Sequence, residues 1–154
     1  MGALNDLAAQ VYENSRSKGF WPENPRERHP AEVLMLVVTE VAEVMEDVRK
    51  GRDLDKLVTT WISGPDTQPG TFEMSSLDKN TYRVYPSGQR EVMDDEKWAQ
   101  LGYVGKPDGV PSELADIIIR VLDACAAWGV DIDEAVRRKM EYNTGREHMH
   151  GRLM

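Results

Sequence analysis

The sequence predicts an all-α protein: a bundle of about four main helices, built as a single domain over residues 1–154 with an inserted region at 52–109. Apolar side chains recur with helical spacing in four segments. Each of these segments is bounded by a glycine, a proline or a side chain that favours a helix cap. A chain of 154 residues is also the size of one ordinary domain.

The first two helices are predicted from apolar spacing and from residues that stop a helix. The first runs from Ala3 to Lys18 and ends at Gly19, which suits the position after a helix. The second begins at Pro30, which suits a first turn, and runs to about Lys50. It is apolar over most of its circumference, which is typical of a helix that is central in a bundle or buried in a subunit interface.

The last two helices are predicted from their caps. Ser112 is a good N-cap for a third helix, which ends at Gly129. Asp131 and Glu134 form the capping-box pattern that starts a fourth helix. Between the second and third helices, the inserted region is rich in glycine and proline and shows no sustained period. It predicts a β-hairpin around Pro-Ser-Gly at 86–88 and a short helix at 94–101.

The charge and cysteine content exclude several classes of protein. Asp and Glu number 27 against 19 Lys and Arg, so the net charge of -8 argues against binding to a nucleic-acid duplex or to an anionic membrane. The single cysteine, Cys125, excludes an intramolecular disulfide and a cysteine-rich zinc site. The chain shows no apolar run long enough to span a bilayer and no signal peptide, so we expect a cytoplasmic protein.

Two pairs of carboxylates lie on the two most apolar helices. Glu40 and Glu43 are three residues apart on the second helix, and Glu113 and Asp116 are three apart on the third. Residues at this spacing share a helix face, so each pair can aim its oxygens at one point. In an apolar bundle such acids need a neutralising cation, and oxygen ligands suit Mg²⁺ or Mn²⁺. If the pairs instead face water, they are ordinary solvated surface.

Three polar residues follow one another at helical spacing at the end of the fourth helix: Lys139, Asn143 and Arg146. Two cations and an amide on one face can bind a phosphate. Basic residues at the end of a helix also interact favourably with its dipole, which is the structural alternative.

These motifs occur in an order that resembles a known family. The strings that carry the resemblance are TEVAEVMEDVRKG at 39–51, GVPSELADIIIRVLDACAAWGVDIDEAVRRKMEYN at 109–143 and the tail GREHMHG at 145–151. Together they resemble the MazG-like nucleotide pyrophosphohydrolases of the all-α NTP pyrophosphatase superfamily. The resemblance covers a little over a third of the chain.

The resemblance implies a Mg²⁺-dependent enzyme that hydrolyses a nucleoside triphosphate, chiefly a dNTP, to a monophosphate and pyrophosphate. It also implies a homodimer or a dimer of dimers in which subunits pair to complete the bundle. The implied metal ligands are Glu40, Glu43, Glu113 and Asp116. The implied proton acceptor is Glu40 or Glu43, and the implied phosphate-binding residues are Lys139, Asn143 and Arg146.

One departure from the family pattern leaves alternatives open. Many members have a doubled glutamate where this chain has Thr39 before Glu40, so one acidic ligand is missing. The alternative from another class is a catalytically silent helical module for dimerisation or binding. Within the superfamily, hydrolysis of phosphoribosyl-ATP or of dUTP is an alternative reaction.

Overall fold

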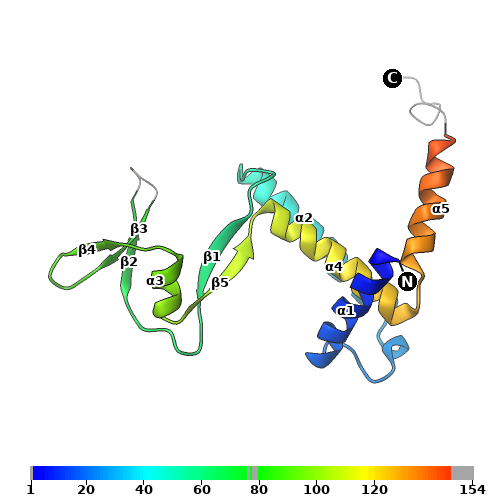
Figure 1. Ribbon diagram of the computed structural model, residues 1–154, viewed down its shortest axis with the longest axis horizontal. Helices are drawn as coiled ribbons and strands as arrows, with labels where there is room; N and C mark the ends of the chain where they lie inside the picture. Colours follow the sequence, from blue (N-terminus) through cyan, green and yellow to red (C-terminus); the bar gives the residue numbers. More distant parts are fainter. Residues whose placement is uncertain (1, 76, 78–79, 147–154) are drawn as a thin grey trace. The chain divides into compact units, whose positions relative to one another are not determined.

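The computed structural model describes residues 2–75, 77 and 80–146, and it contradicts the all-α prediction (Figure 1). The chain divides into two compact units, one made of residues 1–52 and 112–154 and the other of residues 53–111. Among the described residues, the first unit is helical, whereas the second holds two antiparallel sheets and a short helix. The protein is therefore a mixed α/β protein in which the strands lie in the region predicted as an insertion.

Four α-helices and a short 3₁₀ helix form the described part of the first unit: α1 (Ala3–Ser17), Pro25–Glu27, α2 (Pro30–Arg49), α4 (Val110–Trp128) and α5 (Ile132–Thr144). The predicted ends at Gly19, Gly51 and Gly129 are confirmed, since each glycine takes a positive φ. The predicted N-cap at Ser112 is wrong, because α4 begins at Val110. Pro111 therefore lies in the first turn, where its missing N–H breaks no helical hydrogen bond.

The core of the first unit lies where the segment between α1 and α2 packs against α4. Trp21 is buried with Val33 of α2 and Ala124 of α4. The indole Nε1 of Trp21 donates to both carboxylate oxygens of Asp123, at 3.0 and 2.9 Å. Burial raises the pKa of Asp123, although the hydrogen bond from Trp21 acts in the opposite direction. This core thus contains a carboxylate whose charged form is disfavoured.

We expect the charge of Asp123 to make the protein less stable as the pH rises. Its pKa in the folded protein is above the ordinary value of 3.8. The free energy of unfolding therefore falls as the pH rises from 3.8 to the folded-state pKa. Asp123→Asn keeps an oxygen for Trp21 without the charge. It should match or exceed the wild type in free energy of unfolding at pH 7, as measured with urea.

The control is Asp123→Leu, which leaves the buried Trp21 N–H without its acceptor. This variant should lose about 1–3 kcal/mol at all pH values. Equal losses for Asp123→Asn and Asp123→Leu at pH 7 would contradict this explanation of Asp123.

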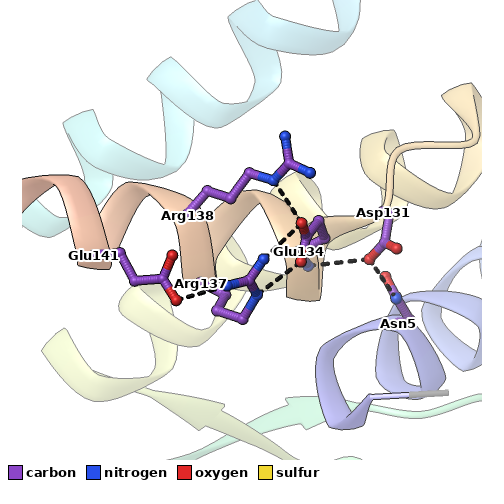
Figure 2. Close-up of polar contacts among 6 residues, drawn as sticks. All are labelled: Asn5, Asp131, Glu134, Arg137, Arg138 and Glu141. Carbon is purple, nitrogen blue, oxygen red and sulfur yellow. Dashed lines mark hydrogen bonds and ion pairs between the residues drawn. The ribbon is translucent and has the colours of Figure 1, made fainter.

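Helix α5 is joined to α1 by polar contacts at its start, which Figure 2 shows. Asp131 is the N-cap of α5 and accepts from the backbone N of Glu134 at 3.1 Å, as the capping-box pattern predicts. The Asn5 side chain donates to Asp131 at 2.8 Å, and this hydrogen bond is the main reason that the pKa of Asp131 is lowered. Further along α5, Glu134 binds both Arg137 and Arg138. These two arginines are therefore engaged in ion pairs within α5.

Among its described residues, the second unit contains five strands and one helix: β1 (Val58–Ser63), β2 (Thr71–Met74), β3 (Thr81–Val84), β4 (Arg90–Val92), α3 (Asp95–Gln100) and β5 (Tyr103–Asp108). Strand β1 pairs with β5, and the other three form a sheet in the order β2-β3-β4, all antiparallel. The β3–β4 hairpin and the short helix α3 confirm the two elements predicted for this region.

Aromatic side chains form the centre of the second unit. The ring of Trp98 on α3 lies 6.3 Å from that of Trp61, 4.6 Å from that of Phe72 and 4.8 Å from that of Tyr103. These residues come from β1, β2 and β5, so one helix side chain connects the two sheets. Contacts among half-buried aromatic side chains therefore join the two sheets of the inserted region.

Candidate metal centre

Three acidic side chains, contributed by α2 and α4, converge in the first unit. Figure 1 shows these two helices running alongside each other. Glu40 comes from α2, and Glu113 and Asp116 come from one face of α4. One carboxylate oxygen from each lies within 4.8 Å of the other two. Glu40 and Glu113 are buried, at 7% and 6% exposed, and Asp116 is half-buried. We call these three residues the acidic cluster.

The buried face of α2 explains which of its acids joins this cluster. Val33, Glu40 and Asp47 are the buried residues of α2, and they are spaced seven apart, which is two helical turns. Glu43 is exposed and is not a member of the cluster. The structure thus brings together three of the four predicted ligands. Asp47, which the sequence analysis did not single out, is buried and pairs with Arg52 at 3.2 Å.

Arg120 is a second residue that the sequence analysis missed. Its Nε donates to Oε1 of Glu40 at 3.0 Å, which links α4 to α2. The spacing contained the signal: Arg120 is four residues after Asp116 and seven after Glu113, so all three share a face of α4. Three carboxylates and one guanidinium give the group a formal charge of two negative units. A divalent cation would neutralise that charge.

The donor set fits a hard divalent cation. All three cluster residues offer carboxylate oxygens, which Mg²⁺ and Mn²⁺ prefer. Ligands at about 2.1 Å from one ion lie at most about 4.2 Å apart. The carboxylate oxygens of the cluster lie within 4.8 Å of one another, an upper bound that is close to this value.

The predicted phosphate-binding residues lie on α5 or just after it. Lys139, Asn143 and Arg146 are all exposed. Lys139 Nζ and Arg146 Cζ lie 5.5 and 5.6 Å from the ring centre of Tyr142. Figure 1 shows α5 leading away from the α2–α4 pair. Residues 147–151 of the tail that resembles the family lie outside the described residues.

An apolar stripe runs along the outer faces of α2 and α4. On α2 it consists of Leu34, Val38, Val41, Met45 and Val48, and on α4 of Leu114, Ile118 and Val121. The spacing alternates between four and three residues, as in helices that pack against each other in a bundle. These side chains are between 38% and 62% exposed. Two neighbouring helices therefore expose the kind of apolar surface that a second pair of helices would bury.

Comparisons with known proteins returned nothing: no family model, no curated protein and no solved structure matches this chain. Among the described residues, no helix combines the length and the apolar character needed to cross a membrane.

Proposed function

We propose that this protein is a Mg²⁺-dependent nucleoside triphosphate pyrophosphohydrolase that acts chiefly on dNTPs. The observation that carries the proposal is the acidic cluster, in which carboxylates from two different helices meet within 4.8 Å. These two helices, α2 and α4, contain the segments that resemble the metal-binding motifs of MazG-like enzymes. A solvated helix surface does not account for the burial of Glu40 and Glu113.

In this proposal, the three residues of the acidic cluster hold a metal ion and a fourth residue accepts a proton. Glu40, Glu113 and Asp116 would hold Mg²⁺, or Mn²⁺ in its place. When bound, such an ion neutralises phosphate charge and lowers the pKa of coordinated water. We assign proton acceptance to Glu43, because its exposed carboxylate is outside the cluster and one turn from Glu40. Water would attack the α-phosphorus, and the bond to pyrophosphate would break.

The apolar stripe supports the pairing of two chains. Half-exposed aliphatic side chains gain roughly 1 kcal/mol each when they are fully buried, so eight of them favour association. A homodimer, or a dimer of dimers, would build a four-helix bundle from two α2–α4 pairs. Lys139, Asn143 and Arg146 are exposed and so remain available to the phosphates of a nucleotide.

A second candidate function has one observation in its favour. Arg120 already neutralises Glu40 without any ion, and Thr39 stands where many family members have a glutamate. Both features suit a helical dimerisation or binding module that lacks turnover.

A nucleotide panel distinguishes these candidates. The purified protein is incubated with each NTP, each dNTP, dUTP and phosphoribosyl-ATP, with Mg²⁺ or with EDTA, and released pyrophosphate and phosphate are measured separately. We expect pyrophosphate only, and only with the metal. If the folded protein releases pyrophosphate from no substrate, the enzyme proposal is wrong and the binding module is favoured. Release of phosphate instead would mean that a different bond is attacked.

A further inference from the structure

We propose that Arg120 is a positioning residue that fixes the carboxylate of Glu40 for the metal ion. This inference rests on the proposed function, because it concerns the ion that the acidic cluster would hold. Nε of Arg120 donates to Oε1 of Glu40 at 3.0 Å, so the contact is a hydrogen bond as well as an ion pair. Arg120 thus touches a ligand and acts through it.

The environment of the pair favours such a role. The Glu40 side chain is 10% exposed and the Arg120 side chain 37%, so the hydrogen bond is formed mostly away from water while the guanidinium still reaches solvent. Among the described residues, Oε2 of Glu40 accepts no side-chain hydrogen bond, which leaves it available to an ion. Groups that orient a metal ligand typically change metal affinity or activity 10–100-fold when they are removed.

The competing explanation is that Arg120 occupies the place of the ion and must be displaced. The two explanations differ in what they attribute to the guanidinium charge. A competitor acts through its charge, so removing the charge should strengthen metal binding. A positioning residue acts through its N–H, so keeping a donor at the same place should preserve metal binding even without the charge.

Substitutions of Arg120 separate the donor from the charge. Arg120→Gln places an amide nitrogen the same number of bonds from the backbone as Nε, so it keeps the donor and removes the charge. Arg120→Lys keeps the charge but moves the donor one bond further out. Arg120→Met removes both. Arg49→Gln is the matched control, because it removes one positive charge from an exposed position on α2.

The measurement is Mn²⁺ affinity, followed by electron paramagnetic resonance of the free ion, with circular dichroism to verify the fold. We expect Arg120→Met and Arg120→Lys to weaken Mn²⁺ binding by about 10–100-fold. Arg120→Gln and Arg49→Gln should stay within about threefold of the wild type. If Arg120→Met does not fold, the other two variants still test the inference, because Arg120→Gln should bind Mn²⁺ more tightly than Arg120→Lys.

Other outcomes overturn the inference in distinguishable ways. Tighter binding by Arg120→Gln and Arg120→Met would show that Arg120 competes with the ion. Unchanged binding in all variants would show that Arg120 plays no part in metal binding, while the proposed function would stand. If the wild type binds no Mn²⁺, the proposed function itself is wrong.

Discussion

Asp116→Asn is expected to lower the rate of pyrophosphate release by at least about 10³-fold while the protein stays folded. The substitution keeps the shape of the side chain and removes one of three charged ligands. Metal-ion catalysis is worth several kcal/mol, and each 1.36 kcal/mol is tenfold in rate. The measurement is kcat/KM with Mg²⁺ for the preferred nucleotide.

The control for Asp116→Asn is Glu32→Gln, which removes an exposed carboxylate from the first turn of α2. It should leave the rate unchanged. Without metal, Asp116→Asn should be at least as stable as the wild type, because one of three mutually repelling charges is gone. A wild-type rate in Asp116→Asn would reject the acidic cluster as the active site.

Val38→Glu is expected to separate the paired chains. Val38 lies in the apolar stripe and is 53% exposed in the single chain. A charge buried at a helical interface without a partner is unfavourable by several kcal/mol, so association should weaken by at least about 100-fold. Size-exclusion chromatography with light scattering should show a dimer, or a dimer of dimers, for the wild type and a single chain for the variant.

The matched control is Val130→Glu, which places the same charge in the loop between α4 and α5. Val130 is 42% exposed but is not part of the stripe. It should associate like the wild type. A wild type that is a single chain at micromolar concentration would contradict the proposed pairing, as would a Val38→Glu variant of wild-type size.

The helices were predictable because local residues determine them. Gly19 and Gly129 end α1 and α4 with φ of 79° and 71°, a conformation that glycine adopts without strain. Asp131 caps α5 through the backbone N of Glu134. Each of these signals acts within a few residues, so the sequence pattern carries it directly.

Strands β1 and β5 of the second unit were not predictable, because they are distant from each other in the chain and the faces of β1 do not alternate. In β1, only Val58 and Trp61 are partly buried, so the period-two pattern of a half-buried strand is missing. Val58 pairs with Asp108, fifty residues later in the chain. The aromatic contacts of Trp98 with Phe72 and Tyr103 likewise depend on tertiary structure.

The candidate site was predictable in part, for a related reason. Spacing placed Glu113 and Asp116 on one face of α4, and the structure brings Glu40 to them. The spacing did not show which other acidic residue of α2 is buried on the same face as Glu40. Because the buried face of α2 repeats every seven residues, Asp47 is buried while Glu43 is exposed. The spacing also placed Arg120 on the face of α4 that holds Glu113 and Asp116, but its partner Glu40 lies 80 positions away in the chain, so only the structure shows that pairing.

The central claim is that Glu40, Glu113 and Asp116 together hold one divalent cation. Anomalous diffraction from crystals grown with Mn²⁺ tests this claim most directly, because it locates the ion without reference to turnover. We expect an anomalous peak about 2.1 Å from a carboxylate oxygen of each of the three residues. An ion bound elsewhere, or well-ordered carboxylates with no anomalous peak between them, would contradict the claim.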